Sequence, residues 1–281
     1  MEFGCPRLGV GRARATPVRL VGHNWRAHCT PLCRLENAGD MRTTIAETDR
    51  MTTSAELWGP FALRVRCAAL ELRAVHDEDI GPLVDLVLAG LHEPDQMPFA
   101  MPWTDAPPEE LRRNTAAYYW RTRASFSPAE WTLDLVVRVD GQIVGVQGFY
   151  AKDYLVVRTG ETGSWLGRRF QGRGIGTAMR KVMCALLFDY LDAQEITSAA
   201  FVDNPASLAV SRKVGYVDNG TFRVQRRPGE LAWNRKLLLT RERFVRPEHP
   251  LQVQGVAPLR AAIGLPPRPE LPDARMTPDQ T

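Results

Sequence analysis

The chain has 281 residues, of which 44% are hydrophobic, 24% charged and 8% aromatic, values that are ordinary for a globular protein. They exclude a fibrous, a wholly disordered and a disulfide-scaffold protein. The 36 basic and 32 acidic side chains leave a net charge of +4 without a long basic run, so we do not expect nucleic-acid binding.

Residues 1–60 show no sustained periodicity, and we expect either an unstructured extension or a translation start placed too far upstream, because Met41 and Met51 precede the first clear core segment. The Arg-rich start lacks the apolar stretch of a secretory signal. No apolar run reaches the roughly 18–20 residues that cross a bilayer, so no membrane association is expected.

The five cysteines are odd in number and form no C-x-x-C pair, which favours a reducing, cytoplasmic location over a disulfide framework. His23, His28, Cys29 and Cys33 lie close together, but their spacing matches no standard zinc pattern. We therefore expect no metal.

Periodic segments begin near residue 69 and continue to about residue 242. The expected elements are a strand over 69–75, helices over 77–91 and 108–123, strands over 133–139 and 142–151, a continued β segment over 155–166, a helix over 174–191, a strand over 195–202, a helix over 205–214, and strands over 216–225 and 231–240. A break of the β segment near Thr159-Gly160 is left open as an alternative. Asp140-Gly141 is a strong hairpin turn signal. The order predicts one α/β domain over 65–245, with a mixed, mostly antiparallel sheet flanked by helices.

Prolines interrupt the chain from residue 246 onward. Because proline lacks a backbone N–H, we expect residues 246–281 to be an extended Pro-rich tail, with a short helix near 256–264 as the one local exception.

The strongest local feature is a glycine-rich turn between an expected strand and an expected helix. Gly172, Gly174 and Gly176 let the backbone turn tightly, and the helix that follows offers free N–H groups to an anion. Arg168, Arg169 and Arg173 add charges that match phosphate oxygens, and Thr177 adds a hydroxyl. These features predict a pyrophosphate site. A Walker loop is excluded because no Lys follows the glycines, and the G-x-G-x-x-G dinucleotide spacing is absent.

The segment Gln171–Gly176 resembles the [QR]-x-x-G-x-[GA] loop of the GNAT superfamily of acyl-CoA-dependent N-acyltransferases. Asn204-Pro205-Ala206-Ser207, followed by Lys213-Val214-Gly215-Tyr216, is similar to that family's N-x-x-S…K-x-G-[FY] segment. The run Glu161–Leu166 is similar to the E-x-G-x-W-L strand of the branch that acetylates ribosomal-protein N-termini. The resemblance covers about residues 69–242.

The resemblance implies a splayed pair of strands that holds acetyl-CoA or another acyl-CoA, and direct attack of an amine on the thioester. Glu161 is the expected general base, acting through water, and Ser207 the expected proton donor to the leaving thiolate. The alternatives are an exposed strand-end Glu and a helix-capping Ser. The expected cofactor-binding residues are Trp165, Leu166, Gly167, Arg168, Arg169, Gln171, Gly172, Arg173, Gly174, Ile175, Gly176, Thr177 and Asn204.

The acceptor pocket is expected between the loop 92–104 and the hairpin 222–233. The acceptor itself stays open among a protein N-terminus, a lysine, an amino sugar and a small polyamine. Acetyl is the family's usual acyl group, whereas a dicarboxylic acyl such as succinyl would need a nearby cation. A non-catalytic CoA-binding regulatory domain is the alternative from another functional class. A homodimer is compatible with the sequence.

Overall fold

The computed structural model describes residues 51–268. Nine strands form one sheet in the order β7-β8-β6-β5-β4-β3-β2-β1-β9. Neighbouring strands are antiparallel except for β5 and β6, which are parallel. The strands are β1 (Arg64–Cys67), β2 (Leu70–Ala74), β3 (Glu130–Val139), β4 (Gln142–Lys152), β5 (Glu161–Leu166), β6 (Glu195–Phe201), β7 (Val217–Arg227), β8 (Glu230–Thr240) and β9 (Gln252–Gln254). The expected α/β fold with a mostly antiparallel sheet is confirmed.

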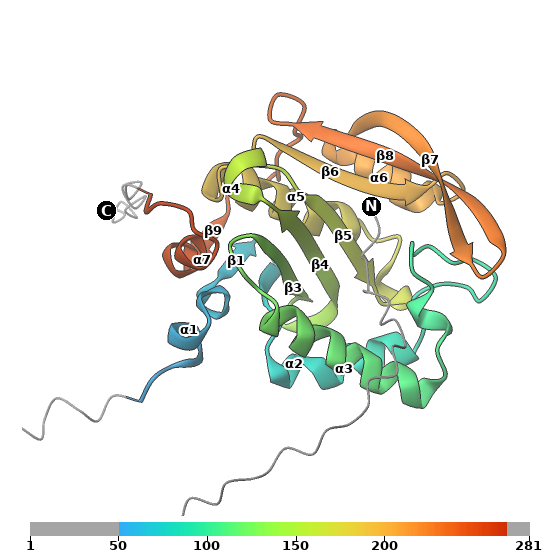
Figure 1. Cartoon of the computed structure of the whole chain (residues 1–281), viewed down its shortest axis with the longest axis horizontal. Helices are drawn as coiled ribbons and strands as arrows, with labels where there is room; N and C mark the ends of the chain where they lie inside the picture. Colours follow the sequence, from blue (N-terminus) through green and yellow to red (C-terminus); the bar gives the residue numbers. More distant parts are fainter. Residues whose placement is uncertain (1–50, 269–281) are drawn as a thin grey trace, which may run out of the picture. The chain divides into compact units, whose positions relative to one another are not determined.

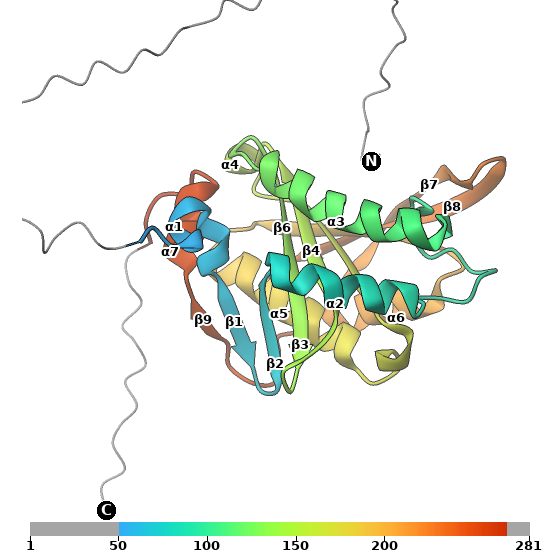
Figure 2. The same cartoon turned by 90° about the horizontal axis from the view of Figure 1, so that it is seen from below.

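Helices cover both faces of this sheet. α2 and α3 lie side by side on one face, and α5 and α6 lie on the other (Figures 1 and 2). The helices are α1 (Ser54–Leu57), α2 (Asp77–Leu88), α3 (Pro108–Ala124), α4 (Tyr154–Val157), α5 (Ile175–Tyr190), α6 (Pro205–Val214) and α7 (Val256–Ala262). α5 contributes the largest share of the buried core, with Val182, Met183 and Leu186 at most 1% exposed. This helix therefore fixes the position of the glycine-rich turn that precedes it.

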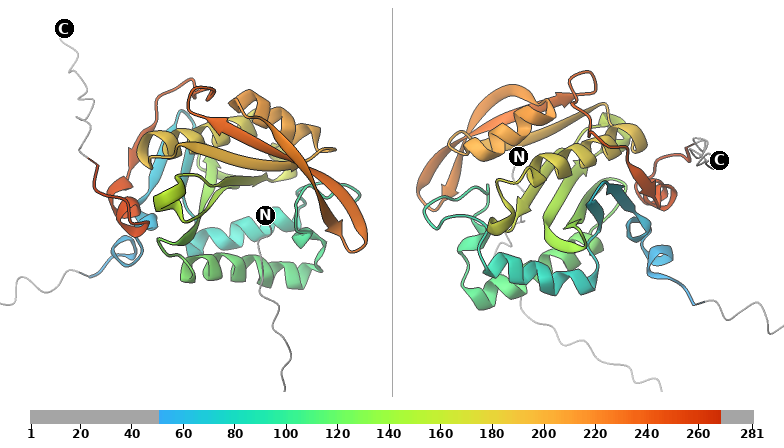
Figure 3. Two further views of the ribbon diagram at one scale, coloured as in Figure 1. Left: turned by 45° about the horizontal axis from the view of Figure 1, so that its top comes forward. Right: turned by 180° about the vertical axis from the view of Figure 1, so that it is seen from behind.

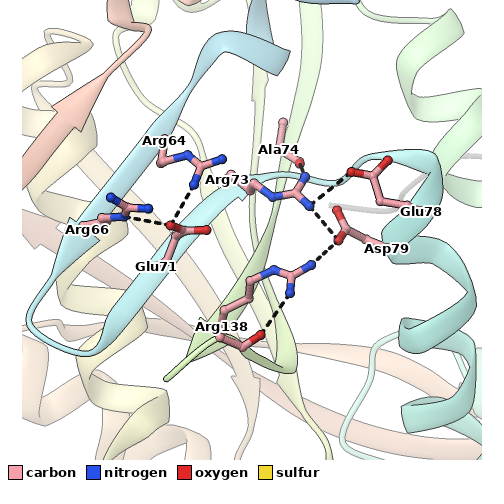
Figure 4. Close-up of polar contacts among 9 residues, drawn as sticks. Arg64, Arg66, Glu71, Arg73, Ala74, Glu78, Asp79 and Arg138 are labelled. Carbon is pink, nitrogen blue, oxygen red and sulfur yellow. Dashed lines mark hydrogen bonds and ion pairs between the residues drawn. The ribbon is translucent and has the colours of Figure 1, made fainter.

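An ion-pair cluster attaches the start of α2 to the sheet (Figure 4). The Asp79 carboxylate is fully buried and accepts hydrogen bonds from the guanidinium groups of Arg73 on β2, at 2.9 Å, and Arg138 on β3, at 2.7 Å. It also accepts the backbone N–H of His76, which closes a capping box at the helix start. The carboxylate thus joins α2 to two strands.

The segment 155–166 has the break near Thr159-Gly160 that the sequence left open, but the residues before the break are helical and not a strand. Its first part forms a single helical turn, α4, and the strand begins only at Glu161. Asp153 and Arg158 flank α4 with left-handed backbone at φ of 52° and 49°. Tyr154 is fully buried and donates its hydroxyl to the Leu191 carbonyl at 2.9 Å. This tertiary contact overrides the strand propensity of the two valines that follow Tyr154.

Part of the expected C-terminal tail belongs to the sheet. β9 pairs with β1, and α7 follows it, close to the position expected for a short helix. Arg260 of α7 is 3% exposed, pairs with Asp192 at 2.8 Å and donates to the Tyr190 carbonyl at 2.7 Å. Figure 3 shows α1 beside α7. Fixed structure therefore extends beyond the expected 65–245, while the expectations for residues 1–50 and 269–281 lie outside the described residues.

Candidate functional site

The two parallel strands at the centre of the sheet separate after a short contact. β5 and β6 pair only at Glu161 with Thr197 and at Thr162 with Ser198. β5 then continues to Leu166 and β6 to Phe201 without pairing to each other. The strands therefore splay apart, and the opening lies between β5 and the start of α6, which follows β6.

The glycine-rich turn lies at one end of this opening. Gly172 and Gly174 have φ of 73° and 81°, a left-handed conformation that strains any residue with a Cβ. Gly174 is the N-cap of α5, and its carbonyl accepts the N–H groups of Thr177 and Ala178. Residues 171–174 are exposed. The first N–H groups of α5 thus start from an exposed turn, as anion binding requires.

Three cationic side chains surround the turn. Arg168 pairs with Glu93 at 3.0 Å, with both side chains about half exposed, so this pair is weak and readily exchanged for another anion. Arg169 lies over the ring of Phe170, with the guanidinium carbon 4.8 Å from its centroid. Arg173 is exposed. The arrangement concentrates positive charge where a diphosphate would meet the helix terminus.

Some of the groups expected to contact the cofactor form hydrogen bonds within the protein instead. The Gln171 side-chain amide donates to the carbonyls of Leu91, at 2.7 Å, and Leu166, at 3.0 Å. The N–H of Gly167 donates to the Val144 carbonyl. Gln171 therefore ties the turn to β5 and to the segment after α2, which is a positioning role. Gly176 faces Val210 of α6 and Leu166, and a Cβ placed on it would be in ordinary van der Waals contact with both side chains.

Glu161 and Ser207 lie on the two elements that border the opening. Glu161 is half-buried at the start of β5, and burial raises the pKa of its carboxyl. Ser207 is in the first turn of α6, where its backbone N–H donates to the Asn204 side chain at 3.0 Å. Asn204 is therefore the N-cap, with Pro205 after it, and the Ser207 hydroxyl is not used for capping.

A buried polar network crosses the opening on its α5 side, and sequence reasoning missed it. Arg180 of α5 is 5% exposed and donates to the hydroxyls of Ser164 on β5, at 2.8 Å, and Ser211 on α6, at 3.0 Å. It bridges the two elements where strand pairing has ended. The available signal was a charged residue within the apolar stretch of this helix. Tyr216 is buried nearby and contacts Thr162, as expected for a core residue.

The two expected walls of the acceptor pocket contact each other. Arg227, at the tip of the β7–β8 hairpin, pairs with Asp105 at 2.7 Å and donates to the Pro94 carbonyl. Figure 1 shows the end of this hairpin next to the loop that precedes α3. Trp103 stacks near Trp165 of β5, with centroids 6.5 Å apart. His92 bonds with Thr104 inside the loop. The loop 92–107 therefore lies between the hairpin and the open strands.

Residues 51–268 contain neither a candidate metal site nor a candidate membrane span. In this part of the chain no three His, Cys, Asp or Glu side chains converge as a metal site would require. No helix there has the length and apolarity to span a membrane. The cluster of His23, His28, Cys29 and Cys33 lies outside this range.

Comparison with known proteins agrees with this geometry. A family model described as an acetyltransferase (GNAT) domain matches residues 69–217, more than half of the chain. The chain is 31% identical over 84 residues to a Bacillus subtilis (strain 168) protein named putative ribosomal N-acetyltransferase YdaF. That match covers 30% of this chain and 45% of the relative, so it spans less than half of the relative's length.

Solved structures share the fold at low sequence identity. Mycobacterium smegmatis RimJ, in complex with CoA-disulfide, has a TM-score of 0.57 and 20% identity, covering 73% of this chain and 96% of its own. RimL, a ribosomal L7/L12 alpha-N-protein acetyltransferase in complex with coenzyme A, has a TM-score of 0.50 and 22% identity, covering 61% and 94%. The family match and the splayed sheet together show that this chain belongs to the GNAT acetyltransferase family.

Proposed function

We propose that this protein transfers an acetyl group from acetyl-CoA to a primary amine, by direct attack while both substrates are bound. The observation that carries the proposal is the opening between β5 and β6, which the anion-binding turn borders at one end and Glu161 at the other. A linear cofactor with a diphosphate at one end and a thioester at the other suits such an opening.

The cofactor would lie along the unpaired part of β5. Its diphosphate would meet the backbone N–H groups at the start of α5 and the charges of Arg168, Arg169 and Arg173. The Thr177 hydroxyl is in the first turn of the same helix. The pantetheine arm would pass between the Trp165–Gly167 backbone and Asn204, toward the closed end of the opening. Its amides resemble an added peptide strand there.

The chemistry requires two proton transfers. The amine nitrogen attacks the thioester carbonyl carbon, and Glu161 removes a proton from the nitrogen through water. The raised pKa of Glu161 suits a general base, because a stronger base takes that proton more readily. As the carbon–sulfur bond breaks, the Ser207 hydroxyl donates its proton to the thiolate, and solvent restores it. The products are an N-acetyl amine and free CoA.

The first acceptor class to test is a protein amino terminus. The curated relative is named as a putative ribosomal N-acetyltransferase, and the structural relative RimL is described as acting on ribosomal L7/L12. Lysine, amino sugars and small polyamines are the alternatives. A homodimer is also part of the proposal. The assay is therefore run at a defined protein concentration, and the molecular mass of the protein in solution is measured.

The test is a matrix of acyl-CoA donors against amine classes, read by release of free thiol and by mass of the product. We expect thiol release with acetyl-CoA that depends on the amine. Turnover with succinyl-CoA but not with acetyl-CoA would show that the acyl donor is succinyl-CoA and not acetyl-CoA. CoA binding without turnover, unchanged in Ser207→Ala, would make the protein a CoA-binding regulatory domain and refute the enzymatic proposal.

A further inference from the structure

The face of the sheet beneath α3 carries an acidic site that the proposed mechanism does not use. The strand register pairs Asp134 of β3 with Gly148 of β4, and Gly148 with Gly163 of β5. Directly paired residues share a face, and so do residues two apart on one strand. Asp134, Gly163 and Glu161 therefore lie on the same face, with two glycines between Asp134 and the space beside β5.

The Asp134 carboxylate leans toward β5 across the first glycine. A Cβ placed on Gly148 would be 2.7 Å from Asp134 Oδ1 and 3.5 Å from the Gly163 carbonyl oxygen. Only a glycine at position 148 leaves room for the carboxylate in this position. The oxygen thus lies close above the backbone that leads to Gly163.

The second glycine opens a space within this face of the sheet. Gly163 is exposed although β5 is a central strand, and no atom lies within 4 Å of the position its Cβ would take. Glu161 and Trp165 flank it along the strand. The space beside Gly163 therefore has a carboxylate along β5 and another across β4.

Asp134 has no counter-ion among the described residues. Its Oδ2 is buried without a hydrogen-bond partner. Burial raises the pKa of Asp134 to about 6, and hydrogen bonding from Tyr118 of α3 only partly offsets the rise. The contrast is Asp79, whose buried carboxylate has two guanidinium partners. A carboxylate oxygen buried without a cation or a hydrogen-bond donor is costly, so its presence here indicates a role outside the stability of the fold.

We propose that Asp134, together with Glu161, binds the ammonium group of the acceptor in the space beside Gly163. This inference rests on the proposed function and names the acceptor as a cation that reaches the site in its protonated form. Glu161 then removes, through water, one ammonium proton before the attack and passes it to solvent, and it takes the second as the amide forms. Asp134 holds the nitrogen on this face of the sheet and acts as a specificity-determining residue. An anionic acceptor would be repelled by the pair of carboxylates.

The experiment measures equilibrium binding by calorimetry, with the full chain saturated with CoA at pH 8. The probes are a hexapeptide with a free amino-terminal serine and spermidine, each compared with its fully N-acetylated form, which carries no ammonium group. We expect the free amines to bind about tenfold more tightly to the wild type, because a charge-assisted hydrogen bond contributes at least that factor. Asp134→Asn, which keeps the side-chain size, removes most of this preference.

Two controls separate the charge from a change in folding. Asp85→Asn removes an exposed carboxylate of α2 and keeps the preference. Gly163→Ala fills the open space with a methyl group and is expected to weaken amine binding without changing CoA affinity. Gly81→Ala, in equally open space on α2, is expected to change neither amine binding nor CoA affinity.

A wild type that binds free and acetylated probes equally, or an Asp134→Asn variant that keeps the preference, overturns the inference. Preferential binding through Asp134 in a protein that releases no thiol with any amine would support this inference while refuting the proposed function.

Discussion

Replacing Asp79 by Asn is expected to destabilise the fold strongly. The change keeps the side-chain size and removes the negative charge that Arg73 and Arg138 share (Figure 4). Those two guanidinium groups are only 12% and 24% exposed, so water compensates them poorly. α2 leads into the segment whose Gly90 and Leu91 carbonyls accept hydrogen bonds from Arg168 and Gln171, so the effect is expected to reach the glycine-rich turn.

The magnitude follows from the burial of the carboxylate. Breaking a buried ion pair by removing one partner costs about 3–5 kcal/mol, since the remaining charge stays desolvated. Asp79 is fully buried and serves two cations, which places the expected loss within that range. Asp77→Asn is the matched control. Its carboxylate is 70% exposed and pairs with Arg123 at 2.8 Å, so its loss is expected to cost at most about 1 kcal/mol.

Urea unfolding followed by circular dichroism measures both changes. With an m value of about 3 kcal/mol per M, Asp79→Asn lowers the midpoint by roughly 1–1.7 M. Asp77→Asn shifts it by a few tenths. A shift for Asp79→Asn no larger than that of the control would refute the reasoning that this carboxylate holds α2 to the sheet.

Three further predictions concern the proposed reaction. Gly174→Asp should weaken CoA binding at least about tenfold more than Gly174→Asn. Both side chains are strained at the φ of 81°, but only the aspartate repels a diphosphate. Equal CoA affinities of the two variants by calorimetry would show that the turn does not bind the diphosphate. Ser207→Ala should lower kcat about 100-fold with little change in KM for acetyl-CoA, and full turnover in steady-state assays would exclude it as the proton donor. In the pH profile of kcat/KM, activity should fall as the pH drops through the pKa of Glu161, which burial raises, since only the ionised carboxylate accepts a proton. Glu161→Gln should lose this acidic limb of the profile. A Glu161→Gln profile identical to that of the wild type would show that another residue is the general base.

Local signals in the sequence were sufficient for much of the fold. The Asp140-Gly141 turn, the glycines of residues 172–176 and the Asn204-Pro205 helix start are short-range features whose conformations depend on their own backbone chemistry. Each is present in the structure, and the order of strands and helices follows from them. The family resemblance came from the same local segments.

Contacts between distant segments decided the rest. α4 depends on the burial of Tyr154 against Leu191, and β9 on pairing with β1, nearly 190 residues earlier in the chain. Neither contact leaves a periodic pattern at its own position. The alignment of Asp134, Gly148 and Gly163 is set by strand register, and a register shift of one residue would place them on opposite faces. The sequence alone thus determined the fold class and the conformation of the glycine-rich turn. Only the tertiary structure put Asp134 of β3 on the same face as Gly163 of β5, because that requires three strands to be aligned.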